Sequence, residues 1–332
     1  MFRKNVSLLL FLLLCLPIRA WSLTEDPTVS QFIDYMVSNH QFDKHKLEIL
    51  FSKTRKSDRV LAAISRPAET LPWYKYRSIF IQDQRIDNGV KFWKQNESVL
   101  KHAQEVYGIP PQIITAIIGV ETLYGANTGK DRVVDALSTL AFYYPKRADF
   151  FRSELEQFLL LSREQKLDPL SLTGSYAGAM GIPQFIPSSY RSYAVDFNQD
   201  GKTDIWNDPA DAIGSVANYF KLHGWIPGEK VAVRAINTGG SYSDLLTADL
   251  SPSITVGDLL KHQIIPREKI PAMEMVKLLS LEHNATDAEL WLALNNFYVI
   301  TRYNHSPLYA MAVFQLSEMI RSKKEKLELA KD

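Results

Sequence analysis

Glu121 is the residue of this chain whose surroundings best suit chemistry. It is a lone carboxylate inside the apolar run 110–125. Apolar surroundings disfavour the ionised form of a carboxyl group and raise its pKa. A carboxyl group that stays protonated near neutral pH can donate a proton to a leaving oxygen. The alternative is a structural carboxylate that pairs with an arginine or a helix end in a solvated groove.

A second motif is the oxygen-rich loop 196–207. Asp196, Asn198 and Asp200 stand at positions 1, 3 and 5 of an EF-hand-like pattern, and Gly201 stands at position 6, where the chain must turn sharply. Hard oxygen donors of this kind favour Ca²⁺ over Zn²⁺. The loop therefore predicts a calcium site, and because it is single, a structural role is favoured over sensing.

This loop departs from the EF-hand pattern at two positions. Thr203 replaces the usual apolar residue at position 8, and Asn207 at position 12 cannot supply a bidentate carboxylate. A surface turn that binds no metal is the alternative. Three nearby carboxylates could complete a ligand shell: Asp204, Asp208 and Asp211.

Other catalytic signatures are missing from the sequence. The seven histidines are scattered and form no HExxH zinc motif. Phosphate-binding loops and dinucleotide fingerprints are absent, so no organic cofactor is expected. Ser175 lacks the glycine two residues before it that a nucleophile elbow requires. Tyrosines are plentiful, and aromatic rings of this kind can stack on sugars, although most pack in cores.

Composition bounds the protein class. The chain has 332 residues, 46% of them hydrophobic and 23% charged, with a net charge of +1. This length allows two or three domains, and this composition argues against disorder and against several membrane spans. The near-zero net charge gives no reason to expect nucleic acid as a partner.

The N-terminus is typical of a secretory signal peptide. Arg3 and Lys4 precede a short apolar segment, 6–16, and small residues follow near position 20. We expect residues 1–22 to be removed and the mature protein to be periplasmic. An uncleaved anchor and a lipid on Cys15 are the alternatives. Cys15 is the only cysteine, so the mature chain would have no disulfide.

Hydrophobic spacing predicts a mainly α-helical (α+β) chain. Helical spacing is expected over 26–65, 89–107, 111–124, 131–165, 209–223 and 309–321, with a loop over 174–189. Gly125 stands where we expect the cap of the Glu121 helix. Strand-like runs at 231–236, 289–294 and 297–301 predict a small β-rich subdomain.

Three segments in this order identify a family. They are Gly119 to Gly125, Gly174 to Tyr190 with its Gly-Ala-Met-Gly-Ile-Pro-Gln-Phe motif, and Asp196 to Trp206. Together they resemble the lytic murein transglycosylase B family (glycoside hydrolase family 103), over about residues 32–320. The resemblance implies a lysozyme-like helical core with the calcium loop attached. It also implies cleavage of the β-1,4 bond between N-acetylmuramic acid and N-acetylglucosamine, with formation of 1,6-anhydromuramoyl ends.

The resemblance assigns roles to individual residues. Glu121 matches the catalytic acid/base of the family. The calcium loop matches with Asp196, Asn198, Asp200 and Asp211 as side-chain ligands and the carbonyl of Lys202, although the longer spacing to Asp211 makes Asp208 its rival. The matched substrate-binding residues are Ser175, Gln184, Tyr303, Asn304, Tyr309, Tyr76, Tyr219, Lys146 and Arg147, the last two facing peptide carboxylates.

A single catalytic carboxylate suits a substrate-assisted mechanism, which is an exception to the two-carboxylate rule. The sugar's own C6 hydroxyl would replace water as the nucleophile. A hydrolytic muramidase and a non-catalytic wall-binding scaffold are the alternatives, and a calcium sensor is disfavoured. We expect peptidoglycan glycan strands as the partner and a monomeric protein. The expected parts are 1–22 (signal), 23–109 (helical), 110–225 (catalytic core), 226–302 (β-rich) and 303–332 (return to the core).

Overall fold

The structure is a computed structural model that describes residues 26–65 and 71–330. The chain forms two compact units, one up to Arg55 and one from Lys56 onward. The predicted signal segment, 1–22, lies outside the described residues. In the described part of the chain, no helix combines the length and apolar character that a membrane span requires.

The first unit is a helical hairpin of α1 (Pro27–His40) and α2 (Lys44–Lys53). Asp26 and Asp43 cap the two helices by accepting backbone N–H groups of their first turns. Phe32 and Phe51 meet edge to face, 6.0 Å between ring centroids, at the centre of the hairpin. The expected helices before residue 55 are therefore present.

The second unit is built around the buried helix α7 (Pro111–Thr122). Pro111 occupies the first turn of α7, where its missing N–H is harmless. The helices α5 (Asp83–Gln95), α6 (Glu97–Tyr107), α11 (Pro209–Leu222) and α14 (Pro307–Leu329) pack against α7. The apolar character of α7 on nearly every side is explained by this surrounding layer.

A second helical layer supports the loops near α7. Helices α8 (Val133–Tyr143) and α9 (Ala148–Glu164) pack along each other, and α10 (Pro187–Tyr193) packs on α9. The remaining helices are α3 (Asp58–Ile64), α4 (Trp73–Phe80), α12 (Val256–Lys261) and α13 (Asn295–Tyr303). A two-residue ladder, β1 (Asp131–Arg132) with β2 (Thr173–Gly174), closes the loop before the Gly-Ala-Met-Gly motif.

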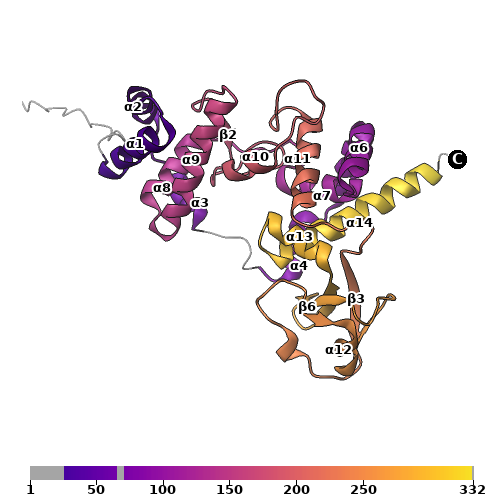
Figure 1. The fold of residues 1–332 in the computed structure, drawn as a ribbon. Helices are drawn as coiled ribbons and strands as arrows, with labels where there is room; N and C mark the ends of the chain where they lie inside the picture. Colours follow the sequence, from indigo (N-terminus) through magenta and orange to yellow (C-terminus); the bar gives the residue numbers. More distant parts are fainter. Residues whose placement is uncertain (1–25, 66–70, 331–332) are drawn as a thin grey trace, which may run out of the picture. The chain divides into compact units, whose positions relative to one another are not determined.

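The β-rich part is an antiparallel sheet in the order β4-β6-β7-β3-β5. Its strands are β3 (Ala232–Asn237), β4 (Ile254–Thr255), β5 (Ile264–Pro266), β6 (Met275–Glu282) and β7 (Ala288–Ala293). Val233, Leu278 and Leu292 form its own small core together with Leu259 of α12. Figure 1 shows β3, β6 and α12 gathered apart from α6, α7 and α11. After α11 the chain passes from the helical core into the β-rich part, and α13 and α14 bring it back to the core.

Several sequence predictions about elements are wrong. The run 297–301 is helix α13, not a strand, because Phe297, Ile300 and Thr301 are buried at helical spacing. The single helix expected over 89–107 is two helices that meet at Asn96. The helix expected over 131–165 is interrupted at Pro145, which begins a single 3-10 turn. The finer part boundaries proposed from the sequence stay predictions.

Candidate active site

Glu121 lies in the last turn of α7, directly before an abrupt reversal of the chain. The helix ends at Thr122, and Leu123 and Tyr124 both adopt left-handed backbone conformations, with φ of 53° and 64°. Their N–H groups bond the carbonyls of Gly119 and Ile118, which gives a Schellman motif. The prediction that Gly125 would cap the helix is wrong, because the reversal begins two residues earlier. Left-handed non-glycine residues are costly and concentrate at functional sites.

Arg85 and Tyr124 hold this strained helix end in place. The Arg85 guanidinium donates to the carbonyl of Gly119 at 2.6 Å, and the Tyr124 hydroxyl donates to the carbonyl of Arg85 at 2.8 Å. A Cβ atom at Gly119 would lie 2.6 Å from the Tyr124 ring, so glycine is required there. Arg85 was not among the residues predicted from the sequence. Its only signal was the presence of Gly119 and Tyr124 in the family motif.

Thr122 ties the helix end to the Gly-Ala-Met-Gly loop. Its hydroxyl is 2.9 Å from the carbonyl of Ile182 and accepts the N–H of Gly125 at 3.0 Å. The loop is tied on its other side by Tyr303, whose hydroxyl donates to the carbonyl of Pro183 at 2.6 Å. Two sequence motifs more than fifty residues apart are therefore joined beside Glu121.

The Tyr309 hydroxyl donates a hydrogen bond to Glu121 Oε1 at 2.5 Å. The residue Glu121 keeps some solvent contact, but its carboxyl group is closely surrounded by protein. Burial raises the pKa of Glu121 to about 7, and the Tyr309 hydrogen bond opposes this rise. In the described part of the chain, no second carboxylate is among the groups that shift this pKa.

Tyr309 and Tyr303 remain protonated whatever the state of Glu121. Burial and the nearby Glu121 carboxylate raise the pKa of both hydroxyls well above the usual value for tyrosine. Tyr309 therefore keeps the proton with which it donates to Oε1. While it donates there, the proton of a protonated Glu121 lies on Oε2, which has no hydrogen-bond partner among the described residues.

Two further predicted tyrosines, Tyr76 and Tyr219, are buried behind this pair. The Tyr219 ring meets the Tyr303 ring at 4.9 Å, and His223 stacks on its face at 3.9 Å. Tyr76 packs on Trp73 and acts electrostatically on Tyr309. Since both rings are only 3% and 7% exposed, they support the site from within, and a direct contact with substrate stays a prediction.

Three predicted polar residues reach the same region. The Gln184 amide donates to the carbonyls of Thr128 and Gly181, at 3.1 and 2.9 Å, and so fixes the loop conformation. The Ser175 hydroxyl accepts the N–H of Ala179 at 3.1 Å within that loop. Asn304 follows Tyr303 and is half-buried, and its side-chain amide has no hydrogen-bond partner in the described part of the chain. It is therefore available to a ligand.

The structure does not join Lys146 and Arg147 to this group. Both are exposed in the 3-10 turn after α8, and Arg147 stacks on Phe150 at 4.2 Å. None of their contacts involves Glu121 or the tyrosines. Their predicted role in holding peptide carboxylates stays a prediction.

The oxygen-rich loop has the turn that a cation loop requires. Gly201 has φ of 88°, and Asp196 accepts the N–H groups of Asp200 and Gly201 through its two carboxylate oxygens. The buried Asp211 accepts the N–H groups of Phe197 and Asp204, so both of its oxygens are engaged by the loop. The described residues contain no cluster of three or more His, Cys, Asp or Glu side chains arranged around a metal position. The oxygen donors of the loop are of the type that binds calcium. The geometry does not distinguish Asp211 from Asp208 as the last ligand.

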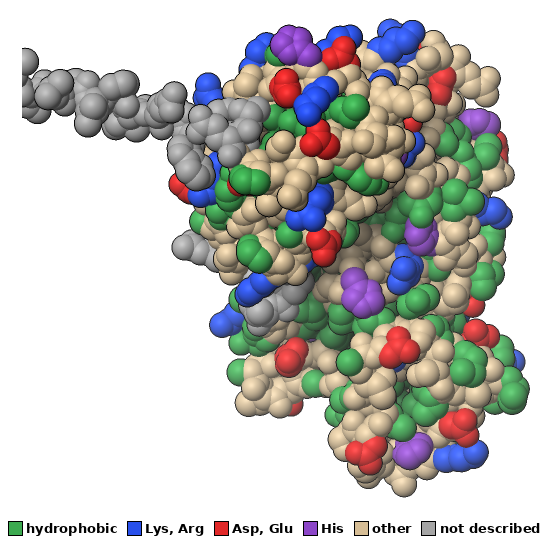
Figure 2. Space-filling view, turned by 60° about the vertical axis from the view of Figure 1, so that its left-hand side comes forward, with side chains coloured by type: hydrophobic (Ala, Val, Ile, Leu, Met, Phe, Trp, Pro, Cys, Tyr) green, Lys and Arg blue, Asp and Glu red, His purple; other side chains and the backbone are tan. Residues whose placement is uncertain are grey.

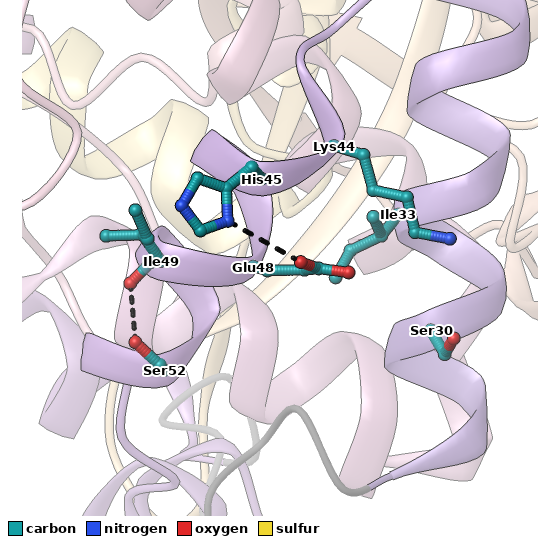
Figure 3. Close-up of a pocket in the computed structure, with 7 residues that line it drawn as sticks. All are labelled: Ser30, Ile33, Lys44, His45, Glu48, Ile49 and Ser52. Atoms are coloured by element: carbon teal, nitrogen blue, oxygen red, sulfur yellow. Dashed lines mark hydrogen bonds and ion pairs between the residues drawn. The ribbon is translucent and has the colours of Figure 1, made fainter.

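Figure 3 shows a different hollow, between α1 and α2, with a volume of about 410 Å³. It contains a His45–Glu48 pair at 3.9 Å and the hydrogen bond from Ser52 to the carbonyl of Ile49 at 2.8 Å. Lys44, at its edge, pairs with Asp34 at 2.7 Å. Its charged groups are exposed and already paired, so this hollow lacks the buried, perturbed group that marks a catalytic site.

One face of the protein can be inspected in Figure 2, where acidic and basic side chains are interspersed. No extended area of a single charge sign dominates this face. The mixture agrees with the net charge of +1.

A helical core that presents one buried acid among tyrosines is the arrangement of a glycan-cleaving enzyme. The family model of the transglycosylase SLT domain matches residues 24–318. The chain therefore belongs to this transglycosylase family, and the family and enzyme class expected from the sequence are confirmed.

Known members of the family give the match its detail. The chain is 45% identical over 305 residues to membrane-bound lytic murein transglycosylase B of Escherichia coli (strain K12), covering 89% of this chain and 83% of that protein. The crystal structure of catenated lytic transglycosylase SltB1 from Pseudomonas aeruginosa is similar with a TM-score of 0.86 and 49% identity, covering 90% and 98% of the two chains. The structure of Escherichia coli Slt35 in complex with calcium has a TM-score of 0.83 and 46% identity, covering 90% and 94%. The activity is accordingly that of a lytic murein transglycosylase, and the helical core is lysozyme-like.

Proposed function

We propose that Glu121 is the single acid/base of a reaction that cleaves the β-1,4 bond between N-acetylmuramic acid and N-acetylglucosamine. The observation that carries this proposal is the Glu121 carboxyl group itself. Its pKa is raised to about 7, its one hydrogen-bond donor is Tyr309, and no carboxylate is coupled to it in the described part of the chain. Near neutral pH such a group exists in both protonation states, which suits a residue that first gives and then takes a proton.

In the first step the proton on Glu121 Oε2 passes to the glycosidic oxygen, and the bond from this oxygen to C1 breaks. The acetamide oxygen of the same muramic acid stabilises the positive charge that develops at C1. Asn304 is available to orient this acetamide group. Tyr309 stabilises the carboxylate left behind, because its hydrogen bond favours the ionised form.

In the second step the C6 hydroxyl of the same sugar attacks C1, and its proton returns to Glu121. The product has a 1,6-anhydro ring, and no water is consumed. Ring closure benefits from the high effective concentration of a hydroxyl group held on the same sugar. Among the described residues, no second carboxylate is coupled to Glu121. This supports the route, since a second carboxylate is what ordinary glycosidases use to activate water or to bind the sugar covalently.

The test is the digestion of purified peptidoglycan by the mature protein, followed by mass spectrometry of the fragments. The proposal predicts ends that are one water lighter than reducing ends, and none with Glu121→Gln. Reducing ends would identify a hydrolytic muramidase instead. The isosteric amide keeps the volume of the side chain and cannot donate and retrieve a proton as the carboxyl does.

We further propose that the loop 196–207 binds a structural Ca²⁺. Asp196, Asn198, Asp200 and the carbonyl of Lys202 would hold the ion, with Asp211 or Asp208 completing the shell. A family member of known structure is described with calcium, which supports this assignment. The ion would stabilise the segment that leads into α11, and it takes no part in the proton transfers. Calorimetric titration of the calcium-stripped protein with Ca²⁺ tests the proposal.

Export to the periplasm is the third proposal, and it rests on the N-terminal sequence alone. The mature protein would begin near residue 23, and its N-terminal sequence after expression in a Gram-negative host tests this. An intact N-terminus, or one starting at a lipid-modified Cys15, would contradict it.

A further inference from the structure

A second cavity of about 420 Å³ lies between the β-rich part and α14. Its walls come from β3, from the loop after β5, from β7 and from α14. Trp291, Phe314 and Met319 supply an apolar floor, and Trp291 and Phe314 meet edge to face at 6.1 Å. The size is that of a small-ligand pocket and would accommodate the end of a short peptide.

Three side chains lining this cavity have hydrogen-bond donors without an acceptor in the described part of the chain. The indole N–H of Trp291 is buried and has no partner, and the residue is only 8% exposed. The Arg267 guanidinium has no ion pair. A buried donor without an acceptor is costly, and such groups are usually satisfied by an unseen water or ligand.

The third donor is the amide of Gln315, whose orientation is fixed by a neighbour. Arg77 donates through Nε to Gln315 Oε1 at 2.7 Å. Because Oε1 must accept this bond, the NH₂ group of Gln315 is left to donate elsewhere. The Trp291 indole N–H is enclosed by protein and does not reach the cavity. An arginine and an amide thus offer hydrogen to the cavity, and the ligand that satisfies them is an acceptor.

The charges around the cavity select an anionic acceptor with a small apolar part. The other charged residues of the walls are already neutralised: Arg234 pairs with Glu289, Glu268 with Lys230, and Glu318 with Arg321. Arg267 therefore contributes the one uncompensated charge of the cavity walls as described. A guanidinium is well matched to a carboxylate, with which it can form two parallel hydrogen bonds.

The position of the cavity links it to the catalytic site. Gln315 follows Tyr309 by six residues on α14, about 9 Å along the helix at 1.5 Å per residue. Arg77, which orients Gln315, directly follows the active-site Tyr76 on α4. The helix that carries Tyr309 therefore also forms a wall of the cavity, and α4 supports this wall through Arg77.

We propose that this cavity binds the terminal carboxylate of a peptidoglycan stem peptide. The identification of the peptide as a wall component rests on the proposed function. Arg267 and the Gln315 amide would hold the carboxylate, and Phe314 and Met319 would contact a small terminal side chain. Nothing in this binding requires Glu121 or any proton transfer.

The test is calorimetric titration of the full mature chain with N-acetyl-D-alanyl-D-alanine. Binding is expected for this dipeptide, and at least tenfold weaker binding for its C-terminal carboxamide, because the charged hydrogen bonds are lost. Arg267→Gln should weaken binding of the acid about tenfold. Lys269→Gln, which removes an equally exposed charge two residues away and outside the cavity, should leave binding unchanged. Gln315→Met, which keeps the length of the side chain and removes the amide, should weaken binding severalfold.

The Glu121→Gln variant separates this proposal from the proposed catalytic role, since it should bind the dipeptide as the wild type does, whatever its activity. Equal affinity for acid and amide, no effect of Arg267→Gln, or no binding at millimolar peptide would overturn the proposal. Tighter binding of the L,L dipeptide than of the D,D dipeptide would also overturn it, in favour of a protein C-terminus as the ligand.

Discussion

Tyr309, at the start of α14, donates a hydrogen bond from its hydroxyl group to Glu121 at the end of α7, 188 residues earlier in the sequence. The two helices pack directly against each other. The hydrogen bond occupies Oε1 and leaves Oε2 to carry the proton of the proposed catalytic acid. Most of the expected properties of the site depend on this one contact.

Tyr309→Phe should move the pH profile of the enzyme. The hydrogen bond lowers the pKa of Glu121 against the effect of burial, so its removal raises this pKa further. The activity that depends on protonated Glu121 should then persist to higher pH, while kcat falls about tenfold or more because the carboxylate intermediate loses a donor. Measurement of kcat/KM against pH on solubilised glycan checks both effects.

Tyr298→Phe provides the matched control for that experiment. Tyr298 is a half-buried tyrosine of α13 that contacts Arg302 and not Glu121. Its variant should keep the wild-type profile. A lower pH limit in Tyr309→Phe, or an equal shift in both variants, would contradict the assignment.

Glu121→Gln should stabilise the protein at high pH. The folded-state pKa, about 7, lies above 4.5, the ordinary value for a glutamate in the unfolded chain, so between these values the folded state binds more protons than the unfolded state. The free energy of unfolding of the wild type therefore falls as pH rises from about 4.5 to 7, by about 3 kcal/mol in total. Glutamine has no charge to desolvate and escapes this loss.

Urea unfolding at pH 5 and pH 8 measures the effect. The variant should gain stability relative to the wild type by about 2–3 kcal/mol between these conditions. A difference between variant and wild type that does not change with pH would mean that the Glu121 carboxyl group is not buried in the native protein.

Gly119→Ala should damage the helix end that carries Glu121. The added methyl group would overlap the Tyr124 ring at 2.6 Å, and overpacking of this kind costs about 1–3 kcal/mol. The displacement should also lower kcat, since catalysis depends on the position of the carboxyl group. Chemical denaturation and activity assays check the two losses.

A second substitution tests whether Tyr124 is the cause. Gly119→Ala combined with Tyr124→Leu removes the ring that the methyl group meets. If the overlap is responsible, the double variant should be less unstable than the sum of the two single variants. Simple additivity would place the damage elsewhere.

Calcium removal should lower the melting temperature without changing the site chemistry. At calcium one hundred times its dissociation constant, binding would stabilise the folded state by about 2.7 kcal/mol, or several degrees in a chain of this size. Asp200→Asn should reduce this calcium-dependent stabilisation, whereas Asp244→Asn, an exposed acid outside the loop, should not. Thermal unfolding with EDTA and with added CaCl₂ distinguishes a calcium loop from a metal-free turn.

The sequence anticipated those parts of the fold that depend on local pattern. Pro111 at the start of α7 and the strands β3 and β7 follow from short-range rules. The strand predicted over 297–301 was wrong because its conformation depends on long-range contacts. Its aromatic and β-branched residues favour a strand locally, but tertiary burial on one helical face prevails.

The catalytic candidate could be predicted, and its supporting contacts could not. A single acidic residue within an apolar run can be recognised from the sequence alone, so Glu121 was predicted from its neighbours. The hydrogen bond from Arg85 to Gly119 joins two segments that are distant in the sequence. Hydrophobic periodicity describes only neighbouring residues and cannot predict such a pair. The left-handed Leu123 was missed because the sequence offers a glycine two residues later, where a cap is usual.

The most direct test of the account is the mass of the glycan ends released from peptidoglycan by the wild-type protein and by Glu121→Gln. If one carboxyl group gives and retrieves the proton, the wild type releases anhydro ends and the variant releases none. Wild-type levels of anhydro ends from the variant would show that another group moves the proton.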